Sequence, residues 1–314
     1  MKVLITGAAG FVGGHLINFL KDQPVEITGA GRNEDEVSIV KEFDVSALEM
    51  DVCDLGSIER GIGLVRPDFI IHLAAQSSAG LSWKDRLGTL DINIMGTVKL
   101  IEGILSSGIK CRLLLVGSAE EYGLVSPEDM PLTESSPLRP VNPYGVSKLI
   151  SGYLPGLYMK ISGDISIVHA RSFNHIGPGQ SEGFVLSDFA KQISEIEKGL
   201  RKPLMSVGNL DAKRDFLDVR DVVRAYWIMV QKGAPGETYN ICSGSCFSIK
   251  DILDMLLAEA LVSIEVETDL ARFRPADIPV MYGDNSKLAG LGWMPEIPIR
   301  DSLLDVLDYW RSKV

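Results

Sequence analysis

The sequence contains no apolar run of the ~20 residues that a membrane-spanning helix needs. Met1 and Lys2 lead directly into an apolar segment that ends in a glycine-rich turn, which leaves no room for a signal peptide. Cysteine is scarce, and the four cysteines are Cys53, Cys111, Cys242 and Cys246. They form no CxxC pair and have no second ligand cluster nearby. We therefore expect a cytoplasmic protein without a membrane partner, a disulfide or a metal site.

Positive charge is also scarce, because 31 Lys and Arg residues face 42 Asp and Glu residues and the formal net charge is -11. Proteins that bind nucleic acid usually need a positive field that displaces counterions from phosphates, so we expect no nucleic-acid partner. With 314 residues, 46% of them hydrophobic, the chain is long enough for one large domain or two lobes. Any anionic ligand must meet individual Arg and Lys side chains.

Short apolar segments alternate with amphipathic segments of helical length up to about residue 174. The expected strands are 3–5, 25–27, 69–71, 113–116 and 165–168. The expected helices are 15–22, 58–65, 87–106 and 144–161. Nearly continuous apolarity is typical of strands that helices cover on both faces. The pattern predicts an α/β fold with a doubly wound parallel sheet of the Rossmann type.

The rhythm changes after about residue 174, where loops rich in Gly and Pro separate later helices expected at 184–198 and 249–260. A helix expected at 219–230 and a strand expected at 238–241 look like a return to the sheet. The chain is therefore expected to form a dinucleotide-binding domain and a smaller, discontinuous C-terminal substrate lobe. The expected bounds are 1–173 plus 218–243 for the first and 174–217 plus 244–314 for the second.

A glycine-rich turn follows the first expected strand and opens the first expected helix. Small residues at this place let the backbone approach a pyrophosphate at the helix N-terminus. The spacing is GxxGxxG rather than GxGxxG, and a glycine trio by itself also serves ordinary turns. Its position after the first strand predicts a dinucleotide site formed by Gly7, Gly10, Phe11, Val12 and Gly13.

Arg32 stands at the end of the second expected strand, where an NAD-specific site usually places a carboxylate for the ribose 2′-hydroxyl. A guanidinium instead suits a 2′-phosphate. The sequence therefore favours NADP(H) over NAD(H). An exposed arginine that only covers the adenine would be compatible with either cofactor.

Tyr144 and Lys148 are four residues apart and share one face of an expected helix that Asn142 and Pro143 can start. A phenol with a pKa near ~10 is a poor proton shuttle, but an adjacent ammonium is expected to lower that pKa. Ser118 follows the strand expected at 113–116 and can hydrogen-bond the same substrate oxygen. Together these residues predict a catalytic centre, although each alone has a plain structural explanation.

These motifs resemble the extended short-chain dehydrogenase/reductase family over nearly the whole chain. Further matching segments are Asp51-Val52, His72-Leu73-Ala74-Ala75, Asn93 to Thr97 and Arg171 to Asn174. The resemblance implies that Asp51 and Val52 flank the adenine and that Asn93 braces the active-site helix. It also implies that the cofactor pyrophosphate and ribose lie along Leu73, Ala74 and Ala75.

The C-terminal half resembles the nucleotide-sugar branch of that family. Arg214, in Arg-Asp-Phe-Leu-Asp-Val, and Arg274, in Arg-Pro-Ala-Asp, match positions that hold the substrate diphosphate. Two arginines on two phosphates make charge-assisted, bidentate bonds, whereas a surface ion pair is the structural alternative for each. Further substrate contacts are expected from Asn174, Val185 and Lys191, and Lys191 is equally explained as a solvated helix residue.

The segment 173–181, Phe-Asn-His-Ile-Gly-Pro-Gly-Gln-Ser, most resembles the GDP-4-keto-6-deoxy-D-mannose reductases. This resemblance implies a GDP-linked 4-keto-6-deoxy sugar as substrate and GDP-D-rhamnose as product, with Tyr144 as the proton donor. Glu120 is also compatible with the function of a GDP-mannose 4,6-dehydratase, since that enzyme has an acid/base glutamate two residues after the position of Ser118. A bifunctional enzyme and a nucleotide-sugar 4-epimerase also stay open.

A dinucleotide-binding sensor without turnover is the alternative from another class of function. Such proteins usually lack the tyrosine or the lysine, whereas this chain has both together with Ser118. The long helices expected at 87–106 and 144–161 are typical of family members that pair across a two-fold axis. We therefore expect a homodimer.

Overall fold

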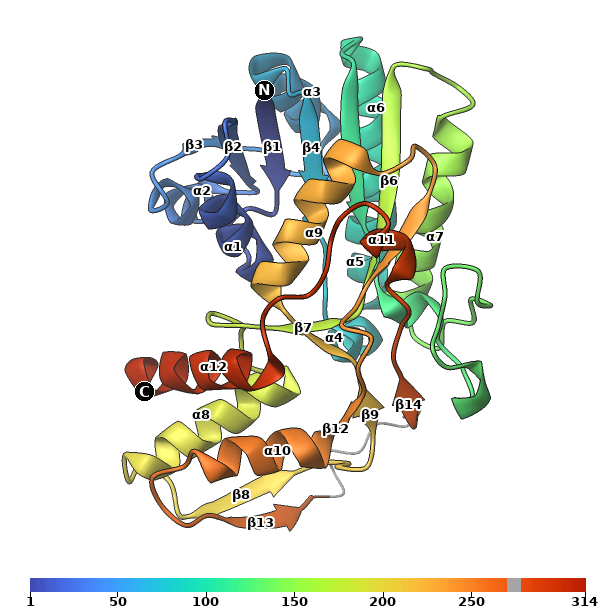
Figure 1. The fold of residues 1–314 in the computed structure, drawn as a ribbon. Coiled ribbons are helices and arrows are strands. Elements are labelled where there is room, and N and C mark those ends of the chain that lie inside the picture. The colour runs from blue at the N-terminus through green and yellow to red at the C-terminus, as the bar shows by residue number, and fades with distance from the viewer. Residues whose placement is uncertain (270–277) are drawn as a thin grey trace.

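The computed structural model describes residues 1–269 and 278–314. Figure 1 shows a central parallel sheet with helices on both faces, and a second group of helices and short strands beyond one end of it. In the described part of the chain, every helix is too short or too polar to cross a membrane.

Seven parallel strands form the central sheet in the order β11-β6-β5-β4-β1-β2-β3. They are β1 (Lys2–Thr6), β2 (Glu26–Gly31), β3 (Ser46–Glu49), β4 (Phe69–His72), β5 (Cys111–Val116), β6 (Ile165–Ser172) and β11 (Thr238–Ile241). The order runs outward from β1 in both directions, which confirms the predicted doubly wound α/β fold.

Alternate residues of β1 enter different hydrophobic cores, because successive side chains of a strand point to opposite faces. Val3 and Ile5 pack with α1 (Phe11–Leu20) and α9 (Val219–Lys232). Leu4 packs on the other face with α3 (Leu55–Val65), α6 (Thr97–Ser107) and α7 (Pro143–Tyr158). The sheet is therefore buried on both sides, as its apolar strands predict.

Several boundaries differ from the sequence pattern. α1 begins at Phe11 rather than at residue 15, because the helix starts directly at the Gly10 N-cap. The helix expected at 87–106 comprises α5 (Arg86–Leu90), a π-helical segment η1 (Asp91–Gly96) and α6. Neither β3, which is a half-exposed edge strand, nor the polar helix α2 (Glu34–Lys41) has the apolar pattern that would predict it.

The second group of elements encloses its own hydrophobic core, formed mainly by α8, α10 and α12. Its elements are β7 (Asn174–Ile176), α8 (Val185–Glu197), β8 (Leu204–Val207), β9 (Lys213–Arg214), β10 (Phe216–Asp218), β12 (Phe247–Ser248), α10 (Ile249–Ala258), β13 (Glu265–Thr268), β14 (Val280–Met281) and α12 (Ile299–Lys313). Leu288 and Trp293, from the C-terminal part of the chain, pack instead in the core of the central sheet. The two-lobe division at the stated bounds stays a prediction.

Short helical segments complete the fold. They are α4 (Ala79–Lys84), η2 (Ala119–Glu121), η3 (Pro127–Asp129) and α11 (Ser286–Ala289). Of these, η2 matters most for the site, since it follows β5 directly and its N-cap is Ser118.

Candidate active site

The expected site residues follow the carboxyl ends of the central strands. Gly7 follows β1, Arg32 follows β2, Leu73 follows β4 and Ser118 follows β5. Because these strands are parallel neighbours, their carboxyl ends share one edge of the sheet. Ligands of doubly wound folds bind outside this edge.

The glycine-rich turn has room for a pyrophosphate at one of its three glycines. A Cβ on Gly7, whose φ is +66°, would lie 2.7 Å from the backbone nitrogen of Ala74, and one on Gly13 would lie 2.3 Å from the Ala8 oxygen. These two glycines therefore allow close backbone packing. A Cβ on Gly10 would meet only the Gly7 oxygen, at 3.3 Å. The N-terminus of α1 thus stays open for an anionic group, and the turn fits a dinucleotide.

Contacts of Phe11 and His15 join this turn to β7 and to the loop that follows it. The rings of Phe11 and His175 are stacked at 6.2 Å with an interplanar angle of 8°, and His15 meets Phe11 edge-on at 5.3 Å. His15 Nε2 lies 2.8 Å from the Pro178 oxygen. Burial lowers the pKa of His175. His175 is therefore a neutral packing partner of the turn, a role that the sequence did not assign.

Arg32 is bound to a carboxylate. Its Nε lies 2.6 Å from Glu36 Oε1, and its backbone N–H donates to Glu36 Oε2 over 2.9 Å. The Arg32 side chain is 66% exposed. A 2′-phosphate would therefore have to compete with Glu36 for the guanidinium.

Hydrogen bonds order the strand ends expected to flank the rest of the cofactor. Asp51 Oδ1 accepts the backbone N–H of Cys53 over 2.8 Å, beside the buried Val52. The backbone N–H of Ala74 donates to Thr6 Oγ1 over 3.2 Å, and the backbone N–H of Leu73 donates to the Thr6 oxygen over 3.1 Å. Leu73 and Ala74 are thus tied to the end of β1.

Ser118, Tyr144 and Lys148 lie together. Tyr144 and Lys148 are buried on α7, and the Tyr144 side chain is hydrogen-bonded to Ser118. The Lys148 ammonium lies 5.9 Å from the centre of the Tyr144 ring and donates to the Val116 oxygen over 2.8 Å. The two expected helix neighbours therefore meet the expected serine from the end of β5.

The expectation that the pKa of Tyr144 lies below that of an ordinary phenol is wrong for this structure. Burial raises the pKa of Tyr144, an effect that the hydrogen bond with Ser118 only partly offsets and that the nearby Glu120 charge reinforces. Burial also lowers the pKa of Lys148 to about 8, while the charge of Glu121 opposes this shift. At neutral pH the phenol carries its proton, which suits a proton donor.

Asn93 connects the π-helical segment to α7. Its Nδ2 donates to Ser147 Oγ over 2.9 Å and to the Gln76 oxygen over 3.0 Å, and its Oδ1 accepts the Gln76 N–H over 2.8 Å. Asn93 is buried. The side chain therefore links the end of β4 to the helix that carries Tyr144 and Lys148.

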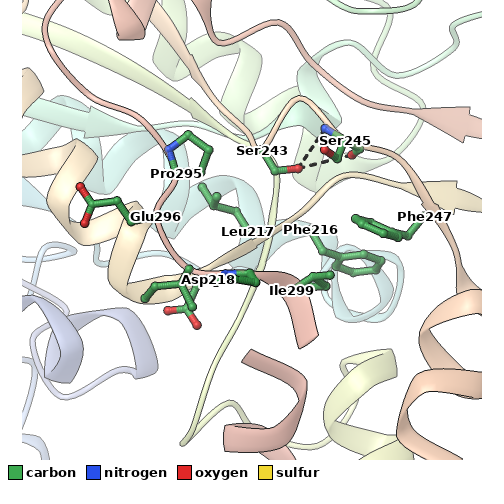
Figure 2. A pocket seen from close by; sticks show the side chains of 11 residues that line it. Phe216, Leu217, Asp218, Ser243, Ser245, Phe247, Pro295, Glu296 and Ile299 are labelled. Carbon is green, nitrogen blue, oxygen red and sulfur yellow. Dashed lines mark hydrogen bonds between the residues drawn. The ribbon is translucent and has the colours of Figure 1, made fainter. Parts of the chain in front are cut away.

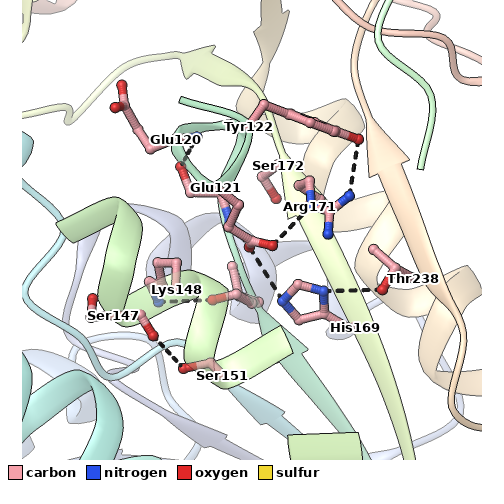
Figure 3. A network of polar contacts seen from close by, with 12 residues as sticks. Glu120, Glu121, Tyr122, Ser147, Lys148, Ser151, His169, Arg171, Ser172 and Thr238 are labelled. Atoms are coloured by element: carbon pink, nitrogen blue, oxygen red, sulfur yellow. Dashed lines mark hydrogen bonds and ion pairs between the residues drawn. The ribbon is translucent and has the colours of Figure 1, made fainter. Parts of the chain in front are cut away.

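Glu120 lies beside Tyr144 at the start of α7. Its Oε2 accepts Asn142 Nδ2 over 2.7 Å, and Asn142 Oδ1 caps α7 by accepting the Gly145 N–H over 2.8 Å. In Figure 3, Glu120 points away from the side chain of Glu121. The neighbouring glutamates thus have different surroundings.

The sequence motifs did not identify the ionic cluster of Glu121, His169 and Arg171 behind the centre (Figure 3). Arg171 Nε donates to Glu121 Oε2 over 2.9 Å, and His169 Nε2 lies 3.4 Å from Glu121 Oε1. Burial raises the pKa of Glu121 to about 7 and lowers that of His169 to about 3. One signal was available: His169 and Arg171 are two apart on a strand and so share one face.

The expected substrate contacts lie in the second group of elements. Asn174 is in β7 beside Phe216 of β10, Val185 begins α8, and Arg214 is in β9 between β12 and β14. Lys191 Nζ donates to Glu182 Oε1 over 2.6 Å. Arg274 lies outside the described residues.

A pocket beside β10 contains none of the expected catalytic residues (Figure 2). Its walls come from Phe216 to Asp218, the loop after β11, Phe247 and the segment 295–299. Asp218 there already accepts hydrogen bonds from Arg220 and Ser302. We therefore place the chemistry at the sheet edge and not in this pocket.

Comparison with known proteins gives consistent matches over the full length. Residues 4–305 match the family model described as GDP-mannose 4,6 dehydratase. The chain is 35% identical to GDP-6-deoxy-D-mannose reductase of Pseudomonas aeruginosa, over 100% of this chain and 98% of the relative. It is 28% identical to GDP-mannose 4,6-dehydratase of Yersinia enterocolitica, over 98% and 92% of the two chains. The structure of RMD from Pseudomonas aeruginosa complexed with NADPH matches with a TM-score of 0.87 and 33% identity, covering 100% of this chain and 99% of that one.

Proposed function

The chain belongs to the GDP-mannose 4,6-dehydratase family, and we propose that within it the protein is an NADPH-dependent reductase. The proposed reaction converts the C4 keto group of GDP-4-keto-6-deoxy-D-mannose to a hydroxyl and yields GDP-D-rhamnose. The observation that carries this proposal is the buried, protonated Tyr144 beside Ser118 and Lys148. The name of the Pseudomonas aeruginosa relative supports the same direction of reaction.

The reduction adds a hydride and a proton across one carbonyl group. A dinucleotide held at the glycine-rich turn would supply the hydride to C4. Tyr144 donates its phenolic proton to the C4 oxygen, and the Ser118 hydroxyl donates a hydrogen bond to the same oxygen. The Lys148 ammonium then stabilises the tyrosinate that remains, because an opposite charge nearby favours the ionised phenol.

The cofactor site extends from the glycine-rich turn to the end of β2. The open N-terminus of α1 at Gly10 suits the pyrophosphate, and Arg32 suits a 2′-phosphate once it leaves Glu36. Asp51 and Val52 would flank the adenine. The RMD structure with NADPH supports NADP(H) as the preferred cofactor, with NAD(H) as the alternative.

The GDP moiety is proposed to bind along the second group of elements. Arg214 and Arg274 would hold the diphosphate, with further contacts from Asn174, Val185 and Lys191. Arginine is suited to this task in a chain whose net charge is -11, since local bidentate bonds must replace a general positive field. For Lys191, binding would require exchange of its partner Glu182.

GDP-mannose 4,6-dehydratase is the second candidate, because Glu120 lies next to Tyr144. In the structure the Glu120 carboxylate accepts the Asn142 amide, so in the reductase we assign it to the start of α7. A dehydratase would instead use Glu120 on the C5 proton and the C6 hydroxyl. A 4-epimerase would, like the dehydratase, reoxidise its cofactor within one turnover.

Redox stoichiometry separates these functions. The enzyme is given GDP-4-keto-6-deoxymannose and NADPH, and cofactor oxidation is followed by absorbance while sugar products are quantified. The reductase oxidises one NADPH for each sugar reduced. Turnover of GDP-mannose without net consumption of cofactor would instead indicate a dehydratase or an epimerase, which the sugar product distinguishes, and would reject the proposal.

We also propose that the protein is a homodimer paired through α5 to α7. Leu87, Tyr153 and Leu157 are exposed apolar side chains on these helices. Light scattering should report a dimer, and Leu157→Glu should give a monomer. Leu64→Glu, at a 78% exposed leucine of α3, is the matched control that should stay dimeric. A wild-type monomer would rule out this assembly.

We further propose a cytoplasmic location. The four cysteines, all in the described part of the chain, are free thiols, which suits a reducing compartment. Fractionation of the producing cells, with activity followed in each fraction, tests this location.

A further inference from the structure

Glu121, Arg171 and His169 form a buried ionic cluster that the proposed mechanism does not use. Glu121 and His169 have no exposed surface, and Arg171 is almost fully buried. Replacing a buried ion pair by apolar residues is often neutral or stabilising for a fold. Stability alone is therefore a weak reason for this cluster, and its neighbours indicate another role.

Glu121 is bonded to the backbone that presents Ser118. Its Oε1 accepts the Ser118 N–H over 2.9 Å, and Ser118 Oγ accepts the Glu120 N–H over 3.2 Å in return. The strand end has no spare room here, since a Cβ on Gly117 would lie 2.2 Å from Glu121 Oε1. Arg171 holds the other oxygen of the carboxylate. The position of Ser118 therefore depends on the Glu121 side chain.

The helix with the catalytic pair rests on the same cluster. A Cβ on Gly152, one turn after Lys148 in α7, would lie 3.0 Å from His169 Cε1 and 3.4 Å from Glu121 Oε2. Figure 3 shows Lys148, His169 and the Glu121 carboxylate on this side of α7. The cluster thus lies between β6 and the two elements that carry the redox centre, which are the end of β5 and α7.

Titratable side chains from several elements surround Lys148. Burial lowers the pKa of Lys148, and Glu121 of η2 opposes that shift. His72 of β4 and His169 of β6 both have a pKa of about 3 through burial, so neither carries charge at neutral pH. Arg171 of β6 is ionised and paired with Glu121.

We propose that Glu121 is a positioning residue of the redox centre, which fixes the backbone of Ser118 and places its carboxylate against α7 one turn after Lys148. This inference rests on the catalytic centre of the proposed function but not on the identity of the sugar. Without the carboxylate, Lys148 loses its proton at lower pH, and the tyrosinate left by Tyr144 loses its stabilising charge on the alkaline side.

The first test compares the pH dependence of kcat/KM in wild type, Glu121→Gln and Asp221→Asn. Asp221 is a matched control, since it is also buried and accepts two backbone N–H groups, from Glu296 and Ile297, and one arginine. Glu121→Gln should move the alkaline limb of the pH profile of kcat/KM to lower pH by about 1 unit. This is the lower end of the pKa shift that a nearby opposite charge causes. Asp221→Asn should leave the limb in place.

A second variant separates the backbone role from the charge. Glu121→Asp keeps the charge but withdraws the carboxylate from the Ser118 N–H by one methylene. It should lower kcat with KM unchanged and leave the alkaline limb near that of wild type. Wild-type kcat in Glu121→Asp would overturn the positioning of Ser118, and this variant serves even where Glu121→Gln does not fold.

A third measurement needs no turnover. NMR of protein labelled with 13C-lysine follows the titration of Lys148, whose signal is identified by its loss in Lys148→Met. The Lys148 signal should titrate at lower pH in Glu121→Gln than in wild type, and an unchanged titration overturns the inference. If wild type does not reduce the keto sugar, the proposed function fails, while this titration still decides the role of Glu121.

Discussion

Replacing Arg32 by alanine tests whether the site is built for a 2′-phosphate. A hydrogen bond to a charged group contributes about 1.5–3 kcal/mol, and an exposed i, i+4 ion pair like that with Glu36 about 0.3–0.5 kcal/mol. On binding the cofactor, the guanidinium exchanges its ion pair with Glu36 for a hydrogen bond to the 2′-phosphate. Arg32→Ala should therefore reduce the free energy of NADPH binding by about 1–2.5 kcal/mol. At 1.4 kcal/mol per tenfold, NADPH binding should weaken about 5- to 60-fold. Because the side chain is 66% exposed, the lower part of this range is expected.

The assay measures kcat/KM for NADPH and NADH at a saturating concentration of the keto sugar. Arg32→Ala should lose most of the preference for NADPH, while kcat/KM for NADH stays near wild type, since the 2′-hydroxyl makes no use of the guanidinium charge. Arg60→Ala is the control, because Arg60 is also an exposed arginine with a weak carboxylate contact, 3.9 Å from Asp54. An unchanged ratio of the two cofactors in Arg32→Ala would refute the assignment.

Three further predictions address the centre and its support. Tyr144→Phe should lower kcat by about 10²- to 10⁴-fold, the range for loss of an acid catalyst, while fluorescence titration shows NADPH binding retained. Asn93→Ala leaves the Ser147 hydroxyl without its donor and should lower the free energy of unfolding in urea by about 1–3 kcal/mol. Burial alone would raise the pKa of Asp218, but hydrogen bonds from Arg220 hold it below its usual value. Its contribution to stability is therefore full above the unfolded pKa of about 3.9 and is lost as the pH falls through the lower folded value. Melting temperatures measured on the acid side should show this loss in wild type and a flatter dependence in Asp218→Asn.

Much of the fold could be predicted because apolar spacing within short segments indicates strands and helices. The five apolar strands expected before residue 174 all lie in the central sheet, and the helices between them differ mainly at their ends. β3 and α2 escaped prediction because an edge strand and an exposed helix need few apolar residues. The interruption of the helix at 87–106 by η1 also escaped it, since apolar spacing does not distinguish helical types reliably.

Part of the candidate site could also be predicted from the sequence, and part could not. Gly7, Gly13, Ser118, Tyr144 and Lys148 could be named from short motifs, because each role depends on neighbours in sequence or on the end of a strand. The catalytic and ligand-binding roles of all the expected site residues stay predictions. The structure brings Ser118 to Tyr144, but the direction of the Tyr144 pKa shift could not be inferred from the spacing to Lys148.

The amino-acid sequence by itself determined the doubly wound sheet and the motifs at its edge, since both depend on apolar periodicity and short spacings. Only the tertiary structure decided the pKa values of the residues in those motifs and the long-range contacts that position them. Burial, which no local pattern measures, sets the pKa of Tyr144 above and that of Lys148 below its ordinary value. The bond from Arg171 to Glu121 joins residues 50 positions apart, and its significance depends on the packing of α7 against both strands. Such long-range contacts exist only once the chain has folded.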